Sequence, residues 1–352
     1  MGRGGMAMET GRLILCILGA MVGAGLASGR EIMRFFTQYG PASQALILLS
    51  CAVTTALMAR LMRRGRLGLG GALAGGTAGK ILFWALLLGT GGGMTAAAGE
   101  LFALTLPLCH ARSLGMLCTL LPGLLLARRS LTALECASRL LLPLLLAAIL
   151  LCLRKTQTGE IAAAETPAES LLLGALQALC YAGMNVLLSA EVLCEAGARC
   201  DTRTGCRGAA WCGGALCGIL LLFNEALLRG PMEARQAELP MVLLLRGYGK
   251  AGFYLSAAVL YLAVITTLFA VLRAQRALAP DGRRQILAGA ATLLTALCGF
   301  ERIVSVIYPV LGFFSLLMIC WPQRKKTAVS GDGGNARRGH PGANLIARQG
   351  RR

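Results

Sequence analysis

Four glycines in the first apolar stretch could expose backbone atoms to a ligand. Gly19, Gly23, Gly25 and Gly29 fall within eleven residues and are followed directly by Arg30–Glu31. Each glycine costs about 1 kcal/mol of helix propensity relative to alanine. The four do not keep to one i, i+4 stripe, as the alternative of close helix packing would favour. The spacing therefore predicts a break in the helix, where freed N–H and C=O groups face a cavity or a bound ion.

Polar residues recur in the sixth apolar stretch. Tyr181, Gly183 and Asn185 lie in its middle, and Glu191 follows near its end. Ordinary hydrogen bonds between helices would explain Tyr or Asn alone, whereas their grouping around a glycine favours a binding site. An ionisable residue within a membrane span is by default a functional candidate. Glu191 could instead lie at the membrane boundary beside Glu195.

Adjacent threonines occupy the eighth apolar stretch. Thr266 and Thr267 follow Ala263, and such hydroxyls most often bond to carbonyls of their own helix. Two hydroxyls and an earlier carbonyl can also present three oxygens to one point, and hard cations are bound by oxygen ligands. Both interpretations, internal helix bonding and a cation site, follow from the spacing.

The elements that must position these residues are membrane helices. Of 352 residues, 56% are hydrophobic and only 14% charged, against about 25% charged in soluble domains. The apolar runs of about 17–25 residues are long enough to cross a bilayer. We predict an all-α polytopic membrane protein with ten spans. These are 11–38, 42–60, 80–104, 113–127, 131–152, 170–195, 209–228, 250–272, 285–300 and 302–321.

The spans form one transmembrane domain in two halves. We place this domain at 11–322, after a short segment, 1–10, and before a Gly/Arg-rich tail, 323–352, that we expect to be disordered. The halves, 11–152 and 170–322, each hold five spans, and because five is odd they have opposite orientations in the membrane. Inverted repeats are a transporter architecture whose sites lie where corresponding helices are broken. This points to the first and sixth spans.

Charge and motifs exclude several classes of protein. The net charge of +19 is spread over short loops and the tail, which is unlike a nucleic-acid-binding surface. More Lys and Arg fall on one side of the membrane, even without the tail, and this places both termini in the cytoplasm. No C-x-x-C or H-E-x-x-H motif and no intramembrane aspartate pair occurs. We therefore expect no enzyme, no structural zinc and no nucleic-acid partner.

One stretch resembles a known family. The run Val22–Ile32, followed by Phe35–Phe36 and Tyr39–Gly40, is similar to the signature of the YkvI family of bacterial membrane proteins. The further similar positions are Tyr181, Asn185, Glu238, Leu239, Pro240, Met241, Thr266 and Thr267. This family in turn resembles the amino acid–polyamine–cation superfamily, whose LeuT-like fold has five-plus-five topology. The resemblance covers roughly residues 10–320.

The resemblance implies a sodium site between the first and eighth spans. Gly19 and Val22 match its carbonyl donors on the first span. Ala263, Thr266 and Thr267 match its donors on the eighth. Sodium would then be the coupling ion, with a proton as the alternative.

The resemblance also implies a substrate site at the first break. Gly23, Ala24 and Gly25 match an unwound stretch whose amides receive a carboxylate. Tyr181, Gly183 and Asn185 would line the opposite wall. The candidate gating or proton-carrying residues are Glu31, Glu100 and Glu191. Arg30 stands where relatives often have an uncharged polar residue.

Together these features predict a secondary active transporter of a small zwitterion, such as an amino acid, in the inner membrane of a bacterium. The lipid bilayer and the solute are its expected partners. One positive charge moved across 100 mV contributes about 2.3 kcal/mol, a useful driving force for accumulation. The alternative is a membrane sensor or partner-binding protein that retains the fold without transport.

Overall fold

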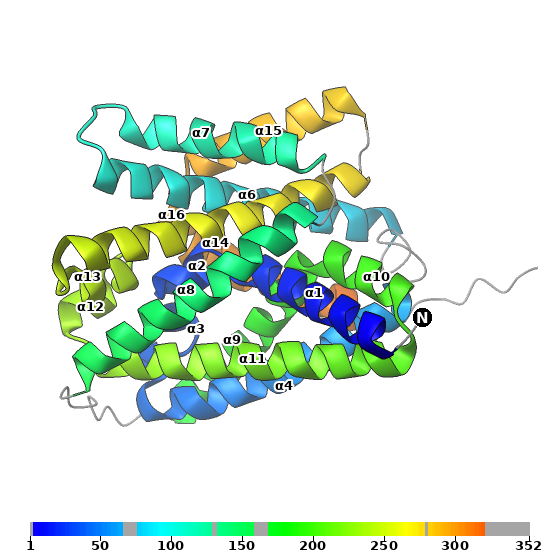
Figure 1. The fold of residues 1–352 in the computed structure, drawn as a ribbon, viewed down its shortest axis with the longest axis horizontal. Helices are drawn as coiled ribbons and strands as arrows, with labels where there is room; N and C mark the ends of the chain where they lie inside the picture. Colours follow the sequence, from blue (N-terminus) through cyan, green and yellow to red (C-terminus); the bar gives the residue numbers. More distant parts are fainter. Residues whose placement is uncertain (1–2, 66–75, 129–131, 158–167, 279–280, 321–352) are drawn as a thin grey trace, which may run out of the picture. The chain divides into compact units, whose positions relative to one another are not determined.

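The protein is built from helices of very different lengths. The computed structural model describes residues 3–65, 76–128, 132–157, 168–278 and 281–320, and every regular element in these ranges is helical (Figure 1). The first half contains α1 (Arg3–Met21), α2 (Ala24–Ser28), α3 (Arg30–Phe35), η1 (Thr37–Ala42), α4 (Ser43–Arg64), α6 (Gly76–Thr105), α7 (Ala111–Leu126) and α8 (Thr132–Thr156). The tail that we expected to be disordered lies outside the described residues.

The second half begins with a helix pair that corresponds to the broken first span. Its elements are α9 (Ala168–Leu188), α10 (Ala190–Arg199), α11 (Thr202–Leu228), α12 (Met232–Gln236), α13 (Pro240–Arg246), α14 (Gly249–Leu278), α15 (Gly282–Ala296), α16 (Phe300–Arg302), η3 (Ile303–Ile307) and α17 (Tyr308–Cys320). The last three elements are continuous and form the tenth span. Gly299, at φ 85°, begins this span, a few residues before the division that we expected at Glu301–Arg302.

Seven segments in the described part of the chain are long and apolar enough to cross a membrane. The three remaining predicted spans are the broken first one and the shorter helices α7 and α15. Large apolar side chains point outward, including Leu172, Trp211 and Ile286, each more than 70% exposed. Such exposure suits contact with lipid rather than water. The prediction of an all-α polytopic membrane protein is confirmed.

Helix contacts correspond between the two halves. α1 packs on α8, as α9 packs on α17 five spans later. In the same way, α6 packs on α15 and α14 packs on α7. Corresponding helices of the two halves also touch each other, since α4 contacts α11 and α6 contacts α14. This exchange of partners supports a repeat of five spans.

The first span is broken where the glycines predicted it. α1 ends at Met21, Gly23 is extended at φ −86° and ψ 179°, and α2 begins at Ala24. A second interruption follows at Gly29, which has a left-handed φ of 88°. Glycine has no Cβ to oppose that conformation, so the chain can change direction between α2 and α3.

The sixth span is interrupted as expected, but near its end rather than at Gly183. α9 continues as a regular helix through Gly183, and the interruption comes at Ser189, before α10. Gly183 instead allows α9 to pack closely on α17, because a Cβ there would lie 2.8 Å from the Leu316 nitrogen and 2.9 Å from the Gly312 oxygen. Gly183 therefore serves close helix packing, and its place in the wall of a substrate site stays a prediction.

Candidate functional site

The break in the first span frees carbonyl groups beside α14. The Gly23 N–H donates to the Met21 oxygen at 3.0 Å, a tighter turn than an α-helix allows. Thr267 Oγ1, on α14, lies 3.4 Å from the Ala20 oxygen and 3.3 Å from the Val22 oxygen. Three oxygens from two spans thus meet at one buried point, which is the ligand type that a hard cation prefers.

The two adjacent threonines behave differently. Thr266 Oγ1 donates to the Ala263 oxygen of its own helix at 3.0 Å, whereas Thr267 reaches across to the first span. Gly19 packs on Ser138 of α8, where a Cβ would collide with the serine hydroxyl. Ala20, which sequence analysis did not select, supplies the carbonyl that reaches Thr267.

The predicted amides lie on the same break. The Ala24 N–H points at the Met94 sulfur of α6, 3.3 Å away, and a thioether is only a weak acceptor. Gly23 lies beside the same methionine and Thr267, because a Cβ there would be 3.3 Å from Met94 Cε and 3.4 Å from Thr267 Oγ1. The break therefore contacts both α6 and α14.

A second polar cluster lies on the other side of the break. Glu31 is only 3% exposed, and its carboxyl group packs so closely on Gly25 that a Cβ there would collide with it. Tyr181 of α9 lies against Phe35 and Phe36, with ring centroids 5.2 and 5.0 Å away. Tyr308 of α17 points its hydroxyl at α6, where a Cβ at Gly93 would lie 3.0 Å from it. We call Glu31, Tyr181 and Tyr308 the Glu31 cluster.

Asn185 is bound within its own helix. Its side-chain nitrogen donates to the Tyr181 oxygen at 3.0 Å, and Ser189 Oγ donates to the Asn185 oxygen at 3.1 Å. Both side chains are buried. These bonds stabilise the end of α9 near its interruption, a role that sequence analysis did not assign to Asn185.

Ion pairs join the spans at the end of the bundle that holds α12 and α13 (Figure 1). Arg30 contacts Glu301 of α16 at 2.5 Å and donates to the Ala237 oxygen at 3.1 Å. Glu100 pairs with Arg112 at 2.7 Å. Partial burial of the Glu238 carboxyl, with the nearby carboxylates of Glu100 and Glu301, raises the pKa of Glu238. Arg30 is thus part of a network that ties the first span to the tenth.

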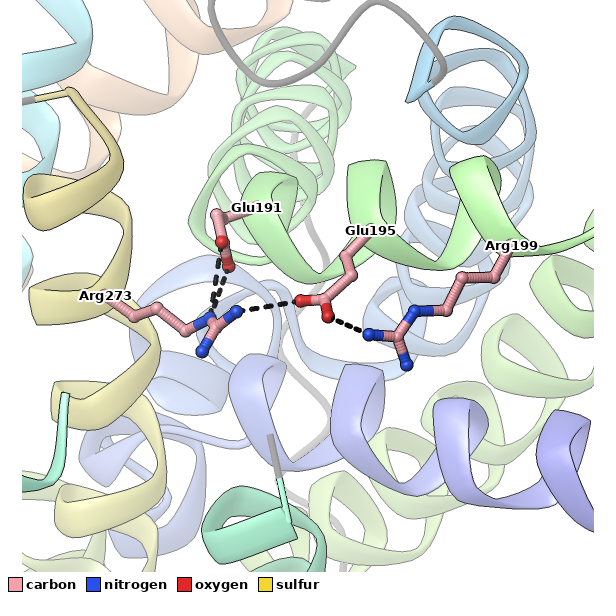
Figure 2. A network of polar contacts seen from close by, with 4 residues as sticks. All are labelled: Glu191, Glu195, Arg199 and Arg273. Carbon is pink, nitrogen blue, oxygen red and sulfur yellow. Dashed lines mark hydrogen bonds and ion pairs between the residues drawn. The ribbon is translucent and has the colours of Figure 1, made fainter. Parts of the chain in front are cut away.

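A different ion-pair network joins α10 and α14 (Figure 2), and α10 lies toward the end of the bundle away from α12 and α13 (Figure 1). Arg273 lies between two carboxylates, 3.1 Å from Glu191 Oε2 and 3.0 Å from Glu195 Oε2. Arg199 contacts the other oxygen of Glu195 at 2.5 Å. Because the Glu191 side chain is 15% exposed and paired, it binds two spans together rather than standing alone in the membrane.

A cavity of about 180 Å³ lies over α3. Its lining residues are Arg30, Met33, Arg34, Gln38, Arg235, Val304 and Ser305. Glu31 and Phe35 lie on the opposite, buried face of α3. The cavity and the Glu31 cluster are therefore separated by the short helix that follows Gly29.

Comparison with known proteins places the chain among membrane proteins. It is 25% identical over 328 residues to the uncharacterized membrane protein YkvI of Bacillus subtilis (strain 168), a match that spans 88% of this chain and 93% of the relative. The chain is thus similar to YkvI over nearly all of its length, and it is a membrane protein. The family resemblance inferred from the first span is thereby confirmed, while the likeness to LeuT-like transporters stays a prediction. No family model matches the chain.

Sequence analysis missed two kinds of site residue in this YkvI-like protein. Ala20 contributes a backbone carbonyl, which no side-chain pattern reveals. Tyr308 could have been found, because it is a tyrosine within an apolar span, the criterion that selected Tyr181. Met94 carries no such signal, because methionine is an ordinary core residue.

Proposed function

We propose that the chain is a secondary active transporter of a small zwitterionic solute. The observation that carries this proposal is the broken first span, whose freed carbonyls meet Thr267 and whose other side holds the buried Glu31 cluster. Non-helical backbone at membrane depth is tolerated where it binds an ion or lines a cavity. The correspondence of helix contacts between the halves supports a LeuT-like arrangement, in which such breaks form the binding site.

The two ion-pair networks suit alternating access. The Arg30 network joins the first and tenth spans at one end, and the Arg273 network joins the sixth and eighth spans toward the other. Opening one network while the other stays closed would expose the break to one side at a time. Rigid-body movement of one group of helices against another is the usual mechanism.

Sodium is the proposed coupling ion. Val22 and Ala20 would offer carbonyls and Thr267 its hydroxyl, and the Ala263 carbonyl lies one turn before Thr267 on the same helix, where it accepts a hydrogen bond from the adjacent Thr266. A bound ion would replace the weak contacts of Thr267, which are 3.3 and 3.4 Å long. A proton carried by Glu31, Glu100 or Glu191 is the alternative. We place the protein in the inner membrane of a bacterium, with both termini in the cytoplasm.

Uptake into vesicles tests the proposal. The purified chain would be reconstituted into liposomes and supplied with a panel of radiolabelled amino acids, under an inward sodium gradient or an equal potassium gradient. We expect saturable, sodium-dependent uptake of at least one compound. Saturable uptake that follows an imposed pH gradient instead would identify a proton as the coupling ion. Binding without uptake would contradict transport and favour a membrane sensor.

A further inference from the structure

We infer that the Glu31 cluster binds a primary ammonium group of the solute. This inference rests on the proposed transport function and specifies the chemical class of its cargo. It concerns residues on the opposite side of the break from the proposed sodium site. The cluster brings together side chains from the first, sixth and tenth spans.

Glu31 is a buried acid without a partner. Its side chain forms no ion pair and no hydrogen bond with any residue that the structure describes, although only 3% of the residue is exposed. Burying a charge without a partner is strongly unfavourable. Neither neighbouring cation pairs with Glu31 in the described part of the chain, because Arg30 pairs with Glu301 and the Arg34 guanidinium contacts Gln38 while its Nε has no partner. A cationic ligand would remove the cost that burial imposes on the carboxylate.

The two tyrosines add unused hydrogen-bonding groups. Both hydroxyl oxygens are buried and lack a hydrogen-bond partner among the described residues. The Tyr181 ring packs on Phe35, which lies one turn after Glu31 on the buried face of α3, and α3 also packs on η3, the element directly before Tyr308. Buried hydroxyls are normally bonded, so an unsatisfied one calls for an explanation. Two such hydroxyls, on spans that pack against the short helix that carries Glu31, indicate a ligand that the cluster is built to receive.

A primary ammonium group matches this set of atoms. It has three N–H donors and no acceptor, and the cluster offers one carboxylate and two phenolic oxygens. The rings of Phe35 and Phe36 pack on Tyr181, and aromatic faces attract cations. An anion would be repelled by Glu31, and a divalent metal requires about six oxygen ligands, more than these three side chains supply.

Matched pairs of ligands test the inference on the purified full-length chain. Thermal stability would be measured with methylammonium, with a panel of amino acids, and with the 2-hydroxy acids that replace the ammonium group by a hydroxyl. We expect at least one ammonium compound to stabilise the wild type, and its hydroxy counterpart to bind more weakly by about 10- to 100-fold. Equal binding of the two members of a pair, or no stabilisation by any ammonium compound, would overturn the inference.

Two variants assign the effect to the cluster. Glu31→Gln should lower affinity for the ammonium compound by about 10- to 100-fold, and Tyr308→Phe by about 3- to 10-fold, while the affinity for the hydroxy acid changes little. Glu225→Gln is the matched control, because this glutamate pairs with Arg229 on α11, away from the cluster. Tyr308→Phe keeps the ring, so it tests the site even if Glu31→Gln does not fold. Unchanged ammonium binding in both folded variants would refute the role of the cluster.

The outcome is separable from that of the transport proposal. Ammonium binding that depends on Glu31, without any uptake into vesicles, would support this site and refute the transport proposal. Uptake of a solute that lacks an ammonium group, unchanged in the Glu31→Gln variant, would support transport and refute the proposed ammonium site.

Discussion

At the scale of single residues, the direction in which a side chain leaves its helix decides what it can contact. Thr266 and Thr267 are neighbours, yet successive residues of a helix point about 100° apart. One hydroxyl therefore closes a bond within α14, and the other reaches the carbonyls of the broken first span. The same logic separates Arg30 from Glu31, since the arginine lines the cavity over α3 while the acid is buried.

The threonine pair offers a matched test of the proposed sodium site. Thr267→Val removes the hydroxyl that lies between the spans, and we expect the sodium concentration for half-maximal uptake to rise by at least about 10-fold. Thr266→Val, which loses only a bond within its helix, should change it less. Measurement of uptake against sodium concentration checks both. Equal effects of the two variants would contradict the assignment of Thr267.

Glu238 gives a prediction of pH dependence. Because its pKa is raised in the folded state, the folded protein binds this proton more tightly than the unfolded chain does. The free energy of unfolding should therefore fall as the pH rises from the ordinary glutamate pKa through the raised one. Glu238→Gln should weaken this dependence and be more stable than the wild type above that interval. The effect is small, because the side chain is exposed and solvent screens it.

Thermal unfolding across a pH series would measure this difference. Glu233→Gln, at an exposed position on the neighbouring helix α12, is the control and should follow the wild-type profile. A Glu238→Gln profile that also follows the wild type would show that this proton is not linked to folding.

At the scale of elements, glycine has two opposite uses in this protein. At Gly23 and Gly29 it interrupts the first span, and φ 88° at Gly29 explains the residue type. At Gly183 it leaves the helix intact and lets α17 approach the backbone of α9. The cluster of glycines in the first span predicted the break there, whereas the close packing at the isolated Gly183 became apparent only in the structure.

A substitution at Gly183 tests the packing role. Gly183→Ala places a Cβ against backbone atoms of α17, which cannot move without separating the helices, so we expect a loss of about 1–3 kcal/mol of stability. Gly218→Ala is the control, since no atom lies within 4 Å of the added Cβ on α11 and helix propensity improves by up to about 1 kcal/mol. Thermal unfolding of the purified variants compares the two. A stable Gly183→Ala protein would contradict the close contact.

At the scale of the whole membrane domain, the broken span lies between two ion-pair networks. The helices that carry the networks are the first, sixth, eighth and tenth spans, which also carry the proposed binding residues. Loss of one network should therefore shift the conformational equilibrium of the protein toward a state that is open at that end. The position of this equilibrium also depends on bound ligand. The effect should be visible far from the substituted residue.

The Arg273→Gln variant tests whether the ion pairs of Arg273 keep α10 and α14 closed together. Without the arginine, Glu191 and Glu195 repel each other and no longer hold α10 to α14 (Figure 2). We expect the labelling rate of Cys194, 4% exposed on α10, to rise about 10-fold, corresponding to a shift of about 1.4 kcal/mol. Peptide mass spectrometry after treatment with a thiol reagent gives the rate. Cys152, buried in α8, should stay protected, and an unchanged rate at Cys194 would contradict a closing role for Arg273.

The amino-acid sequence by itself determined the class of this protein and the break in its first span. Apolar runs of spanning length require helices, because backbone groups in lipid must be bonded within their own segment, and clustered glycines mark where that bonding fails. Tertiary structure decided which oxygens and acids meet. The Ala20 carbonyl, the Tyr308 hydroxyl and the partners of Arg273 lie far from their neighbours in sequence, and only the packing of spans brings them together.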